Sequence, residues 1–406
     1  MDDVTVKPDA IDAAPLGRPA IVAARLLAAV GVGALGLGFL WAGRDGQTAS
    51  LAYHRYLVSY CFWLSIGLGS LFFVGVQHAT RAGWSVCLRR TAEALAGGLW
   101  VLALLFLPIL ASVLSGSDRL YGWNDPALAG GLVAHKAPYL NAPFFALRAV
   151  AYWAVWCLLA WFFWHGSTRQ DASGDPALTV RMERFSGPAL VLFAVAITFA
   201  AFDWLMSLQP EWFSTIFGVY YFSGAAVAAV AVLILAGLIL QGAGRLRREW
   251  TVEHYHDLGK LLFGFVVFWG YIAFSQYLLI WYGNLPEETV WYARRQSGPW
   301  GGVSLALLVG HLLIPFLGLL SRGSKRRPAV LGFWAAWMLA AHWLDLYWLV
   351  MPGVAHERLP LGVLDLCWLV GVGALYMAAV LRLVAAVPLL PQGDPRLGES
   401  LALENT

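Results

Sequence analysis

The feature that most constrains this chain is a series of apolar stretches, each about twenty residues long, that recurs along its whole length. The hydrocarbon core of a bilayer is about 30 Å thick, so a helix needs roughly 20 apolar residues to cross it. Hydrophobic residues make up 60% of the chain and charged residues 13%, whereas about a quarter of a soluble domain is charged. We therefore predict an all-α integral membrane protein with about ten transmembrane helices. The predicted spans are Ala20–Trp41, Tyr53–Val76, Ala94–Val113, Pro143–Trp164, Gly187–Leu208, Thr215–Leu240, Leu258–Tyr282, Gly301–Leu320, Val330–Val350 and Leu361–Val384.

The spans divide the chain into a membrane domain, residues 20–384, a short N-terminal segment, residues 1–19, and a C-terminal tail, residues 385–406. The opening "MDDVTVKPDAIDAAPLGRPA" is acidic and lacks the basic start of a cleavable signal peptide. Both polar ends are expected to be flexible. The longest connection, residues 115–142, is too short to fold alone, since small domains need about forty residues or more. Any chemistry is therefore expected within the helix bundle or in a partner.

The distribution of basic residues predicts the orientation of the chain. Loops after even-numbered spans carry thirteen Lys and Arg residues, and loops after odd-numbered spans carry six. Because cytoplasmic loops are enriched in Lys and Arg, both termini are predicted to be cytoplasmic. The same parity permits spans two to five and six to nine to form two four-helix halves.

Short cofactor-binding motifs are weak in this sequence. The four cysteines, Cys61, Cys87, Cys157 and Cys367, show no CxxC or CxxCH spacing, so iron-sulfur, zinc and covalent haem sites are not predicted. "GVGALG", residues 31–36, has the GxGxxG form but lies inside a predicted span. We interpret it as a small-residue packing face and not as a dinucleotide site.

Ionisable side chains inside spans are costly, so each is a functional candidate. The fifth span ends in "FDWLMSLQPEWFSTIF", which places Asp203 in the outer leaflet and Pro210 at the break before the next span. In "HWLDLYW", His342 and Asp345 are three residues apart and share a helix face. His311, on the preceding span, is predicted at similar mid-depth. The two histidines could ligate haem b, pass protons, or make interhelical hydrogen bonds.

Arranged by predicted depth, the candidates form a ladder that could relay protons across the membrane if the helices bring its members together. The members are Lys260 and His165 at the inner end, His311, His342 and Tyr271 near the centre, and Asp345, Gln276, Asp203 and Asp365 on the outer side.

Several long runs in residues 53–353 resemble one family. The runs "FDWLMSLQPEWFSTIFGVYYFSG", "HDLGKLLFGFVVFWGYIAFSQYLLIWYGNLPEETVWY", "GWSVCLRRTAE", "HKAPYLNAPFFALRAV" and "HWLDLYWLVMPG" are similar to the ActF-type membrane subunit of bacterial alternative complex III, a quinol:cytochrome c oxidoreductase, in the NrfD/polysulfide reductase superfamily. The resemblance implies a ten-helix subunit with two four-helix bundles, at about residues 53–208 and 215–350, in the bacterial inner membrane.

The resemblance also implies partners and cofactors. The expected partners are a second NrfD-like membrane subunit, a periplasmic iron-sulfur subunit, and multihaem and monohaem cytochrome c subunits, with no nucleic acid. Haem c and iron-sulfur clusters would belong to the partners, and this chain would bind no redox centre of its own. Its expected share is scaffolding, proton conduction and a quinone environment, for which the candidates are Asp203, Tyr221, Gln276 and Asp345.

Other functions stay open at this point. A secondary transporter or ion antiporter would also have ten spans and buried acids, but would be expected to show spans broken by Gly and Pro near mid-membrane. Pro315 in the eighth predicted span is the main proline inside a span, which weakens the transporter interpretation. A b-type cytochrome would use His311 and His342 as haem ligands. A polytopic transferase is disfavoured because no sizeable loop carries a nucleophilic or acidic motif.

Overall fold

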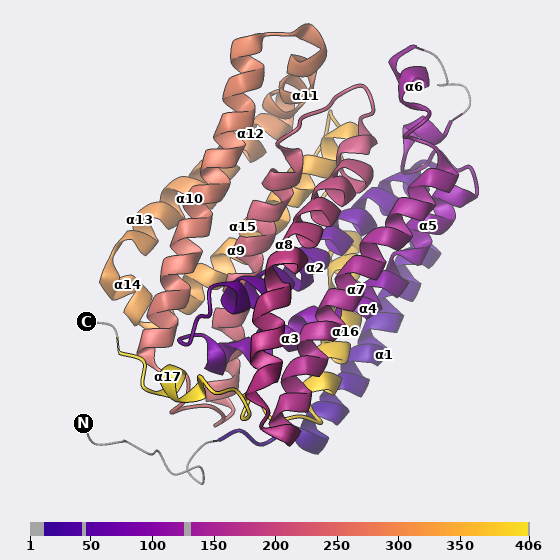
Figure 1. Cartoon of the computed structure of the whole chain (residues 1–406). Coiled ribbons are helices and arrows are strands. Elements are labelled where there is room, and N and C mark those ends of the chain that lie inside the picture. The colour runs from indigo at the N-terminus through magenta and orange to yellow at the C-terminus, as the bar shows by residue number, and fades with distance from the viewer. Residues whose placement is uncertain (1–11, 43–45, 126–130, 405–406) are drawn as a thin grey trace.

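The computed structural model describes residues 12–42, 46–125 and 131–404, and within these ranges the chain forms helices and turns and no strand. Ten of the described helical segments are long and apolar enough to cross a membrane, which confirms the all-α, multi-pass fold (Figure 1). The spans are α1 (Gly17–Ala42), α2 (Gly46–Ala79), α3 to α5 (Val86–Gly97, Leu99–Leu105, Leu107–Leu114), α7 (Ala142–Ser173), α8 (Pro176–Trp204), α9 (Phe217–Gly242), α10 (Val252–Gly283), α12, η5 and α13 (Gly298–Leu307, Leu308–Leu313, Ile314–Leu320), α15 (Pro328–Val350) and α16 (Val363–Val384). The short elements are η2 (Gly122–Asn124), α6 (Gly131–Lys136), η4 (Met206–Leu208), α11 (Pro286–Gln296), α14 (Arg322–Arg326), η6 (Met351–Gly353) and α17 (Leu397–Leu401).

Local sequence signals explain how neighbouring spans are separated. Gly174 ends α7 in the left-handed conformation, with φ 65°, where a residue without Cβ is favoured. Asp175 then caps α8 by accepting a hydrogen bond of 2.9 Å from the backbone N–H of Ala177. Pro176 follows at the first helical position, where its missing N–H costs nothing. The hairpin between α7 and α8 therefore needs only two residues.

The third span begins at Val86, earlier than the predicted Ala94. Its first turns contain charged residues that interrupt the apolar pattern. They are buried in ion pairs: Arg89 lies 3.4 Å and Arg90 3.6 Å from the carboxylate of Glu93, and Arg90 also lies 2.5 Å from Asp171 on α7. Because these charges are paired inside the bundle, the helix continues through them.

The spans pack as the two predicted bundles with two flanking helices. In the first bundle, α2, α3 to α5, α7 and α8 pack together, and in the second α9 packs with α10 and α15, while α12 and α13 pack with α15 and α10. The bundles meet mainly where α9 contacts α2 and α8 and where α15 contacts α2. Gly69 permits this approach, since a Cβ there would lie 2.1 Å from the carbonyl oxygen of Ala225.

The first span packs along α16, which itself covers α2 and α3. Gly31 and Gly38 face α16, and a Cβ on Gly31 would lie 2.7 Å from Leu375. Gly33 and Gly36 have no neighbouring atom within 4 Å of such a Cβ. The predicted packing face is therefore correct for Gly31 and wrong for the other two glycines of "GVGALG", because residues two and five positions further along the helix point away from the side that Gly31 occupies.

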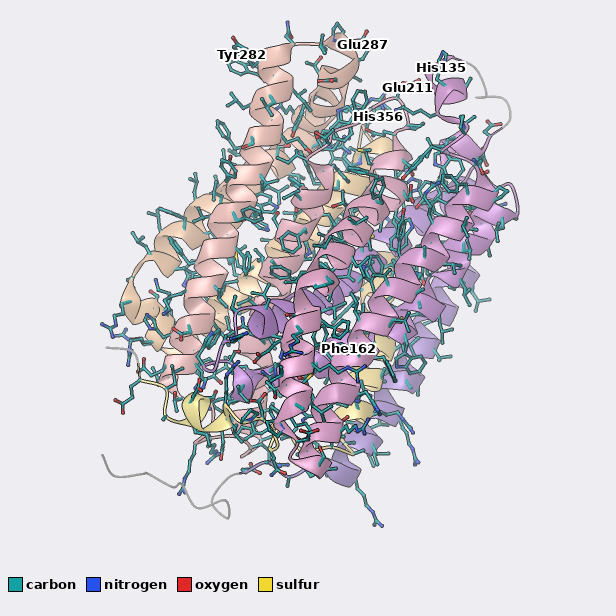
Figure 2. All side chains as sticks on the ribbon, viewed as in Figure 1. His135, Phe162, Glu211, Tyr282, Glu287 and His356 are labelled. Atoms are coloured by element: carbon teal, nitrogen blue, oxygen red, sulfur yellow. The ribbon has the colours of Figure 1, made fainter. Side chains whose placement is uncertain are left out.

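The connections alternate between two ends of the molecule. In Figure 1, α14 and α17 lie at one end, and α6 and α11 lie at the other. Figure 2 shows Glu211, Glu287 and His356 at the α11 end, where the break at Pro210 was predicted. The more basic end is the one with α14 and α17.

The expectation of a flexible C-terminal tail is wrong for the described residues up to 404. The hydroxyl of Ser400 accepts a hydrogen bond of 3.1 Å from the N–H of Cys87 and donates one of 2.7 Å to the carbonyl of Trp84. Asp394 is buried against the guanidinium of Arg89. The tail residues find partners on α3, α7 and α8, and this docking was not visible in the composition of the tail. The start of the N-terminal segment, residues 1–11, lies outside the described residues.

Candidate functional site

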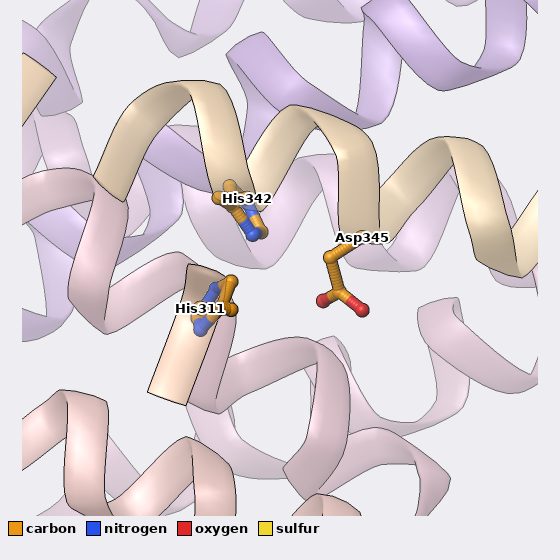
Figure 3. Close-up of side chains that lie close together, drawn as sticks. All are labelled: His311, His342 and Asp345. Atoms are coloured by element: carbon orange, nitrogen blue, oxygen red, sulfur yellow. The ribbon is translucent and has the colours of Figure 1, made fainter. Parts of the chain in front are cut away.

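Three buried side chains converge inside the second bundle. His342 and Asp345 lie on one face of α15, as their spacing predicts, and His311 reaches them from η5 (Figure 3). One ligand atom from each residue lies within 4.8 Å of the other two. All three side chains are buried, at 0 to 1% exposure. Among the described residues, this is the one cluster of His, Cys, Asp or Glu with such spacing, and we call it the His-His-Asp cluster.

Asp345 links three spans through its two carboxylate oxygens. The hydroxyl of Tyr220 on α9 donates a hydrogen bond of 2.5 Å to Oδ1. The indole N–H of Trp269 on α10 donates one of 3.1 Å to Oδ2. These donors stabilise a carboxyl group that would otherwise be costly to bury.

His342 lies where the two bundles meet. Its Nε2 is 2.9 Å from the hydroxyl of Ser65 on α2, while its Nδ1 has no hydrogen-bond partner among the described residues. Gly224 on α9 provides the space for the ring, because a Cβ there would lie 2.5 Å from Cε1 of His342. Ser65 therefore orients the ring and leaves Nδ1 free.

His311 is the least satisfied member of the cluster. Neither of its ring nitrogens has a hydrogen-bond partner in another described residue. Its ring stacks on Trp269, with centroids 3.7 Å apart. It lies in the π-helical turn η5, which ends just before Pro315. Proline has no N–H to donate to the carbonyl four residues earlier, that of His311, and this explains why the α-helical pattern is replaced by a wider turn at this point.

A cavity of about 500 Å³ lies beside the cluster, between α9, α10, α11, α12, η5 and α15. Its lining includes Tyr220 and Trp269, the two donors to Asp345. Phe274, Leu305 and Leu308 also line it and are at least half exposed at the molecular surface. The cavity therefore connects an apolar outer surface with the hydrogen-bonding partners of a buried carboxyl group.

Polar groups extend this cavity toward α11. Tyr292 and Ser304 belong to its lining. Gln276 donates a hydrogen bond of 3.1 Å to the hydroxyl of Tyr292 and accepts one of 3.0 Å from Ser214. Gln276 therefore lies behind the wall and holds the tyrosine in place.

A buried cation lies next to the same wall. Arg295 on α11 is 1% exposed, and its guanidinium stacks 3.5 Å from the ring of Trp291. Its donors reach main-chain carbonyls, including those of Trp348 at 3.2 Å and Leu349 at 2.7 Å. No described carboxylate forms an ion pair with it, and burial lowers the pKa of the guanidinium. An uncompensated positive charge this close to Tyr292 favours a negatively charged group nearby.

The sequence prediction missed Arg295, which was counted only among the basic loop residues. The sequence of α11, "PEETVWYARRQ", contains a signal that could have identified this residue. One face of the helix carries Trp291, Tyr292 and Arg295, and all three are buried. A helix between two spans that presents two aromatic rings and an arginine on one side is expected to cover the end of the bundle.

Asp203 occupies a different site, in the first bundle. Arg148 on α7 approaches it with two donors, Nε at 2.7 Å from Oδ2 and Nη2 at 2.9 Å from Oδ1. The hydroxyl of Tyr152 donates a third hydrogen bond of 2.7 Å. Asp203 is fully buried in this arrangement. The geometry matches an interhelical ion pair, in which both carboxylate oxygens accept hydrogen bonds from buried donors.

The other predicted members of the proton ladder are spread over the molecule. Tyr271 is 65% exposed on the outer surface of α10, and His165 is exposed and stacks on Trp161. Lys260 pairs with Asp257, one turn earlier on the same helix. The structure therefore brings together His311, His342 and Asp345 and leaves these three residues apart from them.

Two further candidates have local partners. Asp365 lies 3.4 Å from Nε of Arg55 and accepts a hydrogen bond of 2.8 Å from the N–H of Gly362, at the start of α16. Tyr221 faces α2 and donates a hydrogen bond of 2.9 Å to the carbonyl of Cys61. Of the four residues proposed for a quinone environment, only Asp345 and Gln276 lie directly behind the cavity wall.

No protein-family profile and no curated protein matches this chain.

Proposed function

We propose that this chain is an integral membrane subunit of a respiratory quinol:cytochrome c oxidoreductase of the alternative complex III type. In this role it scaffolds the complex, provides a quinone environment and takes part in proton translocation. The proposed location is the bacterial inner membrane, with both termini in the cytoplasm. The proposed partners are a second NrfD-like subunit, an iron-sulfur subunit and cytochrome c subunits, which hold the redox centres.

One observation carries the proposal: an apolar cavity has as its inner wall two side chains that both donate hydrogen bonds to a buried carboxyl group. A quinol has an apolar tail that partitions into lipid and a headgroup with two hydroxyls. The exposed side chains of Phe274, Leu305 and Leu308 suit the tail, and the polar atoms of Tyr220, Tyr292 and Ser304 suit the headgroup.

The contacts also suit proton removal. Quinol oxidation releases two electrons and two protons, so the site needs a proton acceptor as well as an electron acceptor. The hydroxyl of Tyr220 already donates to Asp345 at 2.5 Å, and its oxygen can accept a proton from a headgroup hydroxyl as its own proton passes to the carboxylate. The positive charge of Arg295 favours the deprotonated headgroup. The electrons leave through partner subunits.

The first test is to purify the chain, carrying a tag without histidines, from its native membrane in mild detergent. Haem c absorption, identification of partners by mass spectrometry and quinol:cytochrome c activity are then measured. We expect haem c and iron-sulfur subunits to copurify with activity. A chain that purifies alone, without these partners, contradicts the proposal and favours the transporter alternative, for which uptake of labelled ions by the reconstituted chain is the next assay.

A matched pair of variants tests the cavity itself. Tyr220→Phe removes the hydroxyl that contacts Asp345, whereas Tyr221→Phe removes the neighbouring hydroxyl that faces Cys61 on α2. We expect Tyr220→Phe to lower quinol turnover about 100-fold in an intact complex, the lower end of the typical contribution of a proton-transfer group. Tyr221→Phe should leave turnover within about twofold. Equal effects of the two variants would contradict the role of this wall.

A further inference from the structure

We propose that His311, His342 and Asp345 bind a divalent transition-metal ion, with zinc as the ion to test first. The inference is independent of the quinol proposal, because it depends only on the three side chains and their surroundings. Two imidazoles and one carboxylate, without thiolates, form a donor set that suits divalent first-row ions such as Zn²⁺.

The geometry is close to that of a bound site. Zinc takes ligands at about 2.1 Å, so ligand atoms of a tetrahedral ion lie about 3.4 Å apart. The three atoms here already lie within 4.8 Å of one another. Closing the remaining gap requires at most about 1.4 Å of movement. Neither ring nitrogen of His311 is held by another described residue, so rotation of this side chain alone can supply much of the movement.

The unsatisfied nitrogens are the observation that points to a ligand. Buried polar atoms nearly always have a hydrogen-bond partner, and each one that lacks a partner costs about 1–3 kcal/mol. His311 is 0% exposed and His342 is 1% exposed. Three ring nitrogens in these two residues have no partner. A shared ion between them would satisfy two of the three at once.

The surroundings resemble the supporting contacts of metal sites. The ring nitrogen of a metal-bound histidine that faces away from the metal is usually held by a polar group, which sets the tautomer and the ring orientation. Here Ser65 contacts Nε2 of His342 at 2.9 Å and leaves Nδ1 for the ion. Asp345 is held by Tyr220 and Trp269. A single carboxylate offsets one of the two positive charges, and one coordination position is left for solvent or an anion.

Metal and proton compete for this cluster. Imidazole and carboxylate bind a metal ion only in their deprotonated forms. An ion bound at Asp345 would therefore reduce the ability of that carboxylate to accept protons, and added zinc would lower turnover wherever the quinol proposal also holds.

The test measures metal directly. The full chain, with an affinity tag that contains no histidine, is produced in medium supplemented with zinc, purified without chelator and analysed by elemental mass spectrometry. We expect about one zinc per chain. Exchange with Co²⁺ should give the intense visible absorption of a four-coordinate site, which an ion bound loosely at the surface does not give.

Variants distinguish the cluster from other binding sites. His311→Gln and Asp345→Asn keep side-chain size and should each reduce the metal content at least tenfold, while Ser65→Ala should weaken binding by about 10- to 100-fold. His165→Gln, which alters an exposed histidine on α7, should have no effect. A wild-type metal content below about a tenth of an ion per chain would overturn the proposal. Equal metal content in His311→Gln and in the wild type would also overturn it, provided that both proteins are folded as judged by their unfolding midpoints. Zinc bound by the cluster with quinol turnover unchanged by that zinc would contradict only the proposed function.

Discussion

Replacing Asp203 by Asn should destabilise the protein strongly, because it leaves the guanidinium of Arg148 without its counter-charge. The pair is buried, with side-chain exposures of 9% for Arg148 and 0% for Asp203, so solvent screens it little. Removing one partner of a buried pair costs about 3–5 kcal/mol. Replacing both partners, as in Arg148→Met with Asp203→Asn, removes both charges and keeps an acceptor for Tyr152. We expect the double variant to recover most of the loss, which gives a coupling energy of at least about 3 kcal/mol.

Equilibrium unfolding in mixed detergent micelles measures the unfolding free energies of the wild type, the two single variants and the double variant. The fluorescence of the 21 tryptophans is the signal. Glu357→Gln is the matched control, since its side chain is 87% exposed, and it should change stability by less than about 0.5 kcal/mol. A loss below about 1 kcal/mol for Asp203→Asn, or a double variant as unstable as the sum of the single variants, would refute the ion-pair reasoning. Loss of turnover in a complex of unchanged stability would instead support a proton-carrying role for Asp203.

Three further outcomes follow from packing and charge. Gly69→Ala should destabilise the bundle interface by about 1–3 kcal/mol in thermal unfolding, because a main-chain oxygen lies 2.1 Å from the new Cβ. Gly36→Ala is the control and should be neutral, since no atom lies within 4 Å of its new Cβ. Asp394→Asn should release the C-terminal tail, seen as faster proteolysis of the last residues, because the buried carboxylate pairs with an arginine on α3. The hydrogen bond to Arg245 lowers the pKa of Asp12 below its ordinary value of 3.8. The Leu246 amide donates a hydrogen bond to Asp12, and its protection against hydrogen exchange should therefore hold from neutral pH to about 4.5. Protection should be lost only below 3.8, as the carboxylate is protonated. Loss of protection near pH 6 would contradict this prediction.

The fold was largely predictable because membrane insertion imposes a single dominant pattern. A span must be apolar over about 20 residues, and its main-chain hydrogen bonds are satisfied within the helix. Errors occurred where tertiary partners override composition. Arg89 and Arg90 continue α3 because Glu93 and Asp171 pair with them. The C-terminal tail is ordered because Ser400 and its neighbours find partners on α3. The contacts with Asp171 and with the tail join segments far apart in the sequence and cannot be inferred from the residues of one segment alone.

The candidate site was predictable only in its local part. The spacing of His342 and Asp345 fixed their common face, because both belong to one helix. The approach of His311 depends on how α12, η5 and α13 pack against α15, and the cavity depends on the position of α11 over the end of the bundle. Predicted depth in the membrane is not enough to place a residue in the site. Tyr271 was predicted near the centre of the membrane, but its side chain lies on the outer surface of α10 and is 65% exposed.

Asp203 in the first bundle and the His-His-Asp cluster in the second differ in how fully their polar atoms are paired, and this difference separates their expected roles. In the first bundle, Asp203 accepts three hydrogen bonds from fixed donors, so taking up a proton there would break an ion pair at a cost of several kcal/mol. In the second bundle, His311 has no partner and His342 keeps one nitrogen free, beside a cavity with an apolar opening. Groups that are already satisfied hold helices together. Groups left unsatisfied at a cost of about 1–3 kcal/mol each are those that a proton, a metal ion or a headgroup can stabilise on arrival. We therefore expect substitution of Asp203 to act on stability, and substitution of His311 to act on binding and turnover with little effect on unfolding.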